Sequence, residues 1–238
     1  MQNFSIFNKS SILVAAFAFV ANLVNSAGWE VGPSVFLGLN QNQGDIQTGG
    51  DPTAPDFDNS FDGFGFGIGA TTQYTVGRYG FTTGLHYSQR SYNYEASGSA
   101  DPGTGFPIAF DTEMSMTLSS IEIPVAGFRN FQINSRDSVQ VGAGIINYFG
   151  VGDIEMEMEA SAFGQSNSES ADVSYKDARI KRYAMAAQLF VAGSFRRGKV
   201  NFVPSFRLQY GLTDRAKSGS LVDEARTLSA DIQLTALF

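Results

Sequence analysis

Five polar side chains that could do chemistry stand between apolar neighbours in this sequence. They are His86, Glu122, Gln188, Arg207 and Asp231, each flanked on both sides by apolar or aromatic residues. Successive side chains of a strand point to opposite faces, so we expect these five to face one polar interior. Because buried charges need partners, the pattern predicts a plug of paired charges. A narrow path for ions or protons through the same residues is the alternative.

The single histidine is the one starting point for catalysis. Ser88 and Ser205 could lie near His86, and a histidine can activate a neighbouring serine as a nucleophile. Neither serine stands in a nucleophile motif, and His86 falls in the middle of an alternating segment rather than at its rim. We therefore predict no catalytic residues and interpret His86 as a hydrogen-bonded interior side chain.

A stretch rich in aspartate could hold a cation. Asp45, Asp51, Asp56, Asp58 and Asp62 occur there without any Lys or Arg between them. The run 56–63 loosely resembles a calcium loop, but it lacks the spacing and the closing glutamate of that motif. We interpret the stretch as a solvated acidic loop, leave calcium binding open, and predict no metal site and no cofactor.

Eight segments with alternating apolar residues must position these side chains. They span residues 29–39, 64–74, 81–87, 121–127, 139–145, 185–195, 202–210 and 228–238. An apolar outer face combined with a polar lumen is typical of strands in an outer-membrane barrel. The sequence therefore predicts an all-β fold, an eight-stranded antiparallel up-and-down transmembrane β-barrel.

The connections between the segments alternate in length. Residues 45–62, 95–113 and 152–180 are long, 77–80, 130–137 and 196–199 are short, and 213–223 are intermediate. Outer-membrane barrels have long outer loops and short periplasmic turns, so both termini are predicted to be periplasmic. The alternation continues around Met114, Met116 and 154–158, which predicts a β-ribbon that projects beyond the membrane. Its glutamates would keep an exposed edge from pairing.

The last segment carries its apolar residues on one face and finishes on an aromatic. Leu234, Ala236 and Phe238 share that face, and we predict that they form the signal read by barrel-assembly machinery. Other aromatics near strand ends predict two girdles at the membrane interfaces.

Phe128 is placed in the inner girdle, and Tyr92 and Tyr148 are placed in the outer one. A ligand-binding surface at Tyr92 and Tyr94 is the alternative for the outer rim.

The N-terminal residues have the composition of a secretory signal peptide. Lys9 gives a basic start, and residues 12–23 form an apolar run too short to span a bilayer as a helix. We predict a signal peptide over 1–27, cleaved after Ser26 or Ala27, and one barrel domain over 28–238. The absence of cysteine excludes disulfides, and the net charge of −7 argues against nucleic acid as a partner.

Two short motifs carry a family resemblance. Ser120–Val125 reads SIEIPV and Gln209–Asp214 reads QYGLTD. Both resemble the small outer-membrane β-barrel family that includes the PorT-type proteins, in order and spacing over the whole predicted barrel. The resemblance implies an outer-membrane location and eight strands. It implies little about activity, since most members have no defined role, although PorT itself is associated with protein secretion.

We therefore expect a non-enzymatic integral protein of the cell outer membrane with a filled lumen, whose outer loops carry a structural or interaction role. A small porin-like pore, a component of a secretion or surface-assembly machine, and a lipid-modifying enzyme that uses His86 are the alternatives. The expected partners are outer-membrane lipid, the barrel-assembly machinery, and a surface or secretion-system protein. The sequence does not identify a solute, a ligand or an oligomeric state.

Overall fold

The computed structural model describes residues 28–42, 57–59, 63–100, 108–162, 165–217 and 226–238. The predicted signal peptide lies outside these residues. The described part consists of strands β1 (Trp29–Asn42), β2 (Phe57–Asn59), β3 (Gly63–Val76), β4 (Tyr79–Ala100), β5 (Ile108–Gln132), β6 (Asp137–Gly150), β7 (Ile154–Ala162), β8 (Gln165–Val173), β9 (Tyr183–Arg197), β10 (Val200–Gly211) and β11 (Thr227–Leu237). Over the same residues, no helix is long and apolar enough to cross a membrane.

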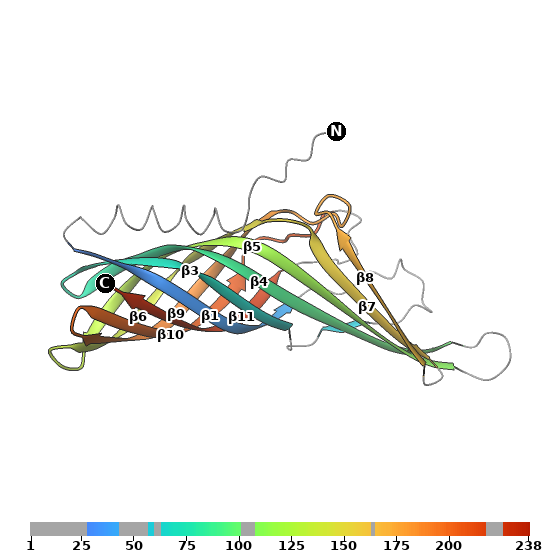
Figure 1. Ribbon diagram of the computed structural model, residues 1–238, viewed down its shortest axis with the longest axis horizontal. Helices are drawn as coiled ribbons and strands as arrows, with labels where there is room; N and C mark the ends of the chain where they lie inside the picture. Colours follow the sequence, from blue (N-terminus) through green and yellow to red (C-terminus); the bar gives the residue numbers. More distant parts are fainter. Residues whose placement is uncertain (1–27, 43–56, 60–62, 101–107, 163–164, 218–225) are drawn as a thin grey trace.

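Eight of these strands close into a ring (Figure 1). In ring order they are β1, β3, β4, β5, β6, β9, β10 and β11, and each is antiparallel to the next. β11 then pairs with β1, with Phe36 opposite Gln233. Closure leaves no unpaired edge in the ring. The eight-stranded antiparallel barrel predicted from the alternation is confirmed.

The outer face of the ring is apolar and its interior is polar. Large apolar side chains such as Leu37, Leu189 and Ile232 are 58%, 62% and 69% exposed. The residues beside them in sequence point inward and are buried, which is the two-residue period of a strand. This arrangement matches strands that face lipid outside and a polar lumen inside.

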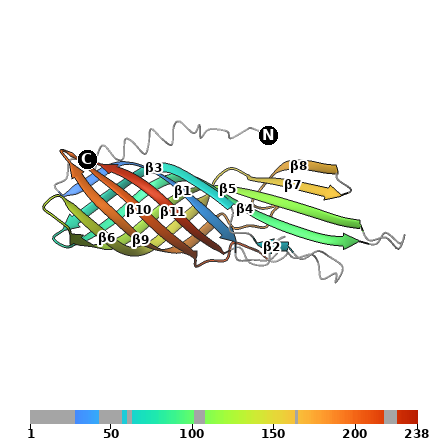
Figure 2. The same ribbon diagram turned by 90° about the horizontal axis from the view of Figure 1, so that it is seen from below.

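The short connections lie at one end of the ring. They are Gly77–Arg78, residues 133–136 and Gly198–Lys199, and β1 begins and β11 ends at the same rim (Figure 2). Gly77 and Gly198 have φ angles of 60° and 64°, a left-handed conformation that glycine adopts without strain. Since outer-membrane barrels have short periplasmic turns, this rim is assigned to the periplasm.

At the opposite end, a flat sheet projects from the ring (Figure 2). β4 and β5 stay paired out to Ala100 and Ile108, β7 pairs with β5, β8 pairs with β7, and β2 pairs with β4. The segment 95–113, predicted as a long loop, is therefore mostly strand. The glutamates of β7 were predicted to protect an exposed edge, and this is wrong, because β7 lies between β5 and β8.

Pro124 lies inside β5, next but one to Glu122, and the register there shows no bulge. Thr83 pairs with Val125 and His86 pairs with Glu122, so no residue is added to either strand. The pairing is interrupted only between these two points, because proline cannot donate to the ladder.

Candidate functional site

The centre of the lumen holds a closed network of charges around Arg90. Its Nε lies 3.0 Å from Glu122 Oε1, and its Nη1 and Nη2 lie 3.1 and 2.9 Å from the two oxygens of Asp231. Arg207 Nη2 donates to Asp231 Oδ2 at 2.8 Å. The two arginines and two carboxylates are almost completely buried and their charges balance. Buried charges are tolerated when opposite charges are paired and joined by well-formed, often bidentate, hydrogen bonds.

The ring of Phe36 lies close to both guanidinium groups. The Cζ of Arg90 lies 5.1 Å from the centroid of Phe36, and the Cζ of Arg207 lies 4.6 Å from it. Both distances are in the range of cation–π attraction. Phe36 thus contacts both guanidinium groups, which also share the carboxylate of Asp231.

Neutral polar groups complete the network. Arg90 Nη1 donates to Asn40 Oδ1 at 2.6 Å. Gln209 Nε2 donates to Asp231, and the hydroxyl of Tyr148 donates to Gln209. The carboxylate of Asp231 therefore accepts hydrogen bonds from three side chains on two strands, Arg90 on β4 and Arg207 and Gln209 on β10.

Glycines on the inner face of β3 make room for this network. A Cβ at Gly67 would lie 2.3 Å from the ring of Phe36, and a Cβ at Gly65 would lie 3.2 Å from the Cγ of Arg90. Gly38 on β1 leaves the same kind of space, since its Cβ would lie 2.0 Å from Asp231 Oδ1. These glycines carry no side chain at the points where the side chains of Phe36, Arg90 and Asp231 approach the barrel wall.

His86 lies among hydroxyl groups rather than among charges. Its Nε2 is 2.8 Å from Ser34 Oγ and 3.1 Å from Thr71 Oγ1. Ser88, one of the two serines considered as a nucleophile, is instead 3.1 Å from Ser120 Oγ. Ser205 and His86 line one cavity of about 50 Å³ without a hydrogen bond between them. No serine–histidine–acid arrangement is formed here.

The predicted lumen cluster is therefore assembled in part. Glu122, Arg207 and Asp231 meet in one network, whereas His86 and Gln188 are buried in the same lumen without a hydrogen bond to it. The residue that joins the network, Arg90, was missed. It shares the inward parity of His86 on the same strand, and that parity was the signal available.

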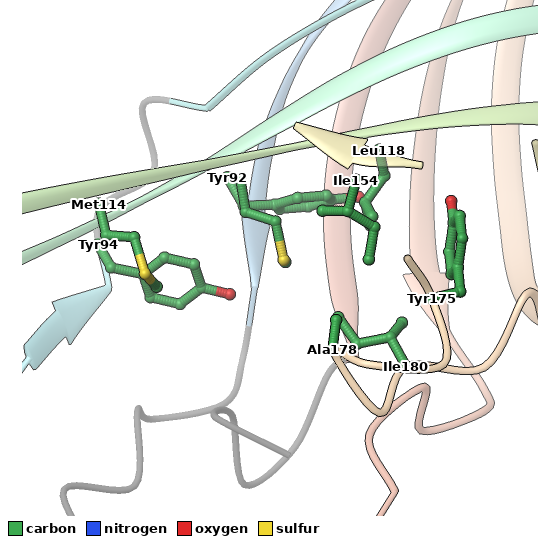
Figure 3. Close-up of a cluster of buried hydrophobic side chains, with 9 residues drawn as sticks. Tyr92, Tyr94, Met114, Leu118, Ile154, Tyr175, Ala178 and Ile180 are labelled. Carbon is green, nitrogen blue, oxygen red and sulfur yellow. The ribbon is translucent and has the colours of Figure 1, made fainter. Parts of the chain in front are cut away.

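An apolar cluster lies outside the charged plug. Tyr92 and Tyr94 from β4 and Met114 and Met116 from β5 pack with residues of β7 and of the segment 174–180. In Figure 3 the ring of Tyr92 extends toward Leu118 and Ile154, and Tyr94 lies beside Met114. The hydroxyl of Tyr175 donates to the backbone carbonyl of Ser119 at 3.2 Å.

Three aromatics assigned to the girdles are inside the barrel. Tyr92, Tyr148 and Phe128 are 3%, 6% and 5% exposed, because they share the parity of the lumen residues. The alternative of a ligand surface at Tyr92 and Tyr94 is also wrong, since both rings are buried in the outer cluster. Arg215 stacks on Tyr148 with its Cζ 5.4 Å from the ring centroid and closes the lumen on that side.

The residues of the predicted assembly signal lie on the outer face of β11. Leu234 and Phe238 are 49% and 58% exposed, and the backbone of Phe238 exchanges hydrogen bonds with that of Val31. Recognition by assembly machinery stays a prediction.

The aspartates considered for calcium fall mainly outside the described residues. Only the backbone of Asp58 is described, as part of β2. Over the described ranges, no group of three or more His, Asp or Glu side chains could hold a metal ion.

The family model of the outer membrane protein beta-barrel domain matches residues 25–216. That model carries no PorT-type designation, so this part of the resemblance stays a prediction. No curated protein matches the chain significantly in sequence.

Several solved structures resemble the chain. Ail, the attachment invasion locus protein of Yersinia pestis, is 13% identical with a TM-score of 0.31 over 88% of this chain and 98% of its own. Neisserial surface protein A is 10% identical with a TM-score of 0.38 over 89% and 96%. The outer membrane protease OmpT from Escherichia coli is 9% identical with a TM-score of 0.35 over 88% and 93%.

Proposed function

The chain belongs to the family of outer membrane protein beta-barrel domains, and from this premise we propose that it is a non-enzymatic, non-conducting scaffold that presents the projecting sheet to a partner outside the cell. The protein resides in the cell outer membrane. Its ring anchors it there. β4 and β5, of 22 and 25 residues, are much longer than the roughly 9–11 residues that a membrane-spanning strand requires, and β7 and β8 widen the sheet that they form.

The observation that carries this proposal is the filled lumen. Arg90 joins β4 to β5 and β11 through three buried hydrogen-bonded contacts with Glu122 and Asp231. Two cavities along the lumen measure only about 50 Å³ and about 10 Å³. An eight-stranded barrel has an interior just wide enough for side chains to fill, so a plug of this kind supports anchoring rather than transport.

The projecting sheet supports the second half of the proposal. Its inner face is packed by the cluster around Tyr92 and Tyr175, which gives the extension a core of its own. The other face carries Glu95, Glu113 and Glu159 directly opposite one another on neighbouring strands. Function is commonly carried by such segments on a rigid scaffold.

Conductance of the refolded full-length chain in a planar bilayer tests the closed lumen. We expect no steady channel from the wild-type protein, and brief openings from an Arg90→Ala/Phe36→Ala variant that removes the centre of the plug. A stable conductance from the wild type would refute the scaffold proposal in favour of the pore.

Binding to whole bacterial or host surfaces tests the second half. A variant in which residues 96–112 are replaced by a short turn keeps the ring intact, and it should lose binding to the partner that the wild type retains. Equal retention of that partner by both proteins would contradict a role for the extension.

A further inference from the structure

The periplasmic mouth of the ring contains a polar cavity of about 750 Å³. The short turns and the periplasmic ends of β1, β3, β5, β6, β9 and β10 form its wall. Arg78, Arg129, Arg136 and Arg196 line it, together with only two carboxylates, Glu30 and Asp137. Its volume falls in the range of sites that hold a drug-sized ligand.

Both carboxylates are already engaged. Glu30 forms an ion pair with Arg196 across the mouth and accepts a hydrogen bond from Asn201 at 3.1 Å. Asp137 accepts from Asn134 at 3.0 Å and from Arg197 at 2.9 Å. Asp137 is therefore occupied by its own partners.

Two of the arginines at the mouth are left without a carboxylate. Arg78 and Arg136 make no ion pair among the described residues, whereas Arg129 stacks on the exposed Phe131, with its Cζ 5.1 Å from the ring centroid. The sequence before residue 28 contains no Asp or Glu that could supply one. The mouth thus carries an excess of positive charge in a chain whose net charge is −7.

The rest of the wall suits a peptide. The buried amides of Gln73 and Gln140 line the inner side and offer both donors and acceptors. At the rim, the rings of Trp29 and Tyr74 pack on each other with centroids 5.1 Å apart. Guanidinium groups match the planar geometry of carboxylates, so the arginines fit acidic side chains and the amides fit main-chain groups.

We propose that this cavity binds an acidic peptide segment of a periplasmic protein. A membrane headgroup fits less well, because lipid surrounds the outside of the ring whereas the cavity lies within its mouth. A single inorganic anion would leave most of the volume empty. The site is independent of whatever the projecting sheet binds on the other side of the membrane.

Acetylated tetraglutamate is the probe, and acetylated tetraglutamine is its neutral match. The full-length protein is refolded into phosphatidylcholine nanodiscs, and isothermal titration calorimetry measures the heat change on addition of each peptide. We expect a saturable change with tetraglutamate and none with tetraglutamine. Raising the salt from 50 to 300 mM should weaken binding at least several-fold.

Arg136→Gln and Lys199→Gln form a matched pair of variants. Both remove one positive charge from the periplasmic end, but Lys199 does not line the cavity. Loss of one carboxylate–guanidinium contact worth about 1.4 kcal/mol weakens binding about tenfold, so we expect this for Arg136→Gln and less than a twofold change for Lys199→Gln. Unchanged cooperative urea unfolding shows that each variant is folded.

Three results would overturn the proposal. Equal losses in the two variants would mean diffuse electrostatic attraction. Saturation by inorganic phosphate at the same concentration as the peptide would mean a simple anion site. Loss of peptide binding in nanodiscs that contain phosphatidylglycerol would mean that lipid headgroups occupy the arginines.

Discussion

Replacing Arg90 with methionine is the sharpest test of the plug. The substitution keeps a long apolar side chain but removes the contacts of the guanidinium with Glu122, Asn40 and Asp231. Asp231 keeps Arg207 and Gln209. Glu122 loses its only ionic partner while remaining fully buried. The cost therefore falls mainly on one carboxylate.

The expected magnitude follows from that asymmetry. A buried ion pair broken by removal of one partner typically costs about 3–5 kcal/mol of unfolding free energy. Glu122→Gln alone leaves Arg90 with Asp231 and Asn40, and its cost should be that of one charged hydrogen bond, about 1.5–3 kcal/mol. The double variant Arg90→Met/Glu122→Gln removes the orphaned charge and should be more stable than Arg90→Met alone.

Urea unfolding of the refolded protein in lipid vesicles measures these differences. Trp29 reports the transition from the periplasmic end, at a distance from the substituted residues. Arg207→Met is the control, because Asp231 retains both contacts with Arg90. If Arg90→Met cost less than about 1 kcal/mol, or if the double variant were no better than the single, the charge-network interpretation would be refuted.

Three further changes probe the wall, the lipid face and the extension. Gly67→Ala places a Cβ 2.3 Å from the ring of Phe36 and should lower the unfolding free energy by about 1–3 kcal/mol; wild-type stability would contradict the role of the glycine. Ile232→Lys puts a charge on a side chain 69% exposed toward lipid and should cost up to about 2–4 kcal/mol in vesicle unfolding, whereas Ile232→Val should cost little. Glu113→Gln relieves repulsion from Glu95 and Glu159 and should slow amide hydrogen exchange in 108–117; faster exchange would refute this.

The alternation of side chains was sufficient to predict the ring and the direction of its lumen residues. A strand period of two fixes the face of every residue once one face is known. Glu122, Arg207 and Asp231 were therefore placed correctly inside the barrel. The same rule places Tyr92, Tyr148 and Phe128 inside the barrel. Their aromatic type instead led to the prediction that they lie in the girdles, which is wrong.

The partners within the lumen could not be predicted in the same way. Which inward residues meet depends on the stagger between strands and on the reach of long side chains. Arg90 lies four residues beyond His86 on β4, yet its guanidinium meets Glu122, which pairs with His86 in the ladder. The alternate glycines 63–69 were visible in the sequence, but their role as space for Phe36 and Arg90 required the closed ring.

The length of β4 determines how far the tip of the projecting sheet lies from the bilayer. The strand continues for ten residues after Arg90, from 91 to Ala100, which at about 3.3 Å per residue extends it by roughly 30 Å. A molecule bound near the tip would be separated from the bilayer by more than the Debye length of about 8 Å at physiological salt. Dissolved salt would thus screen a molecule bound at the tip from the charge of the lipid surface.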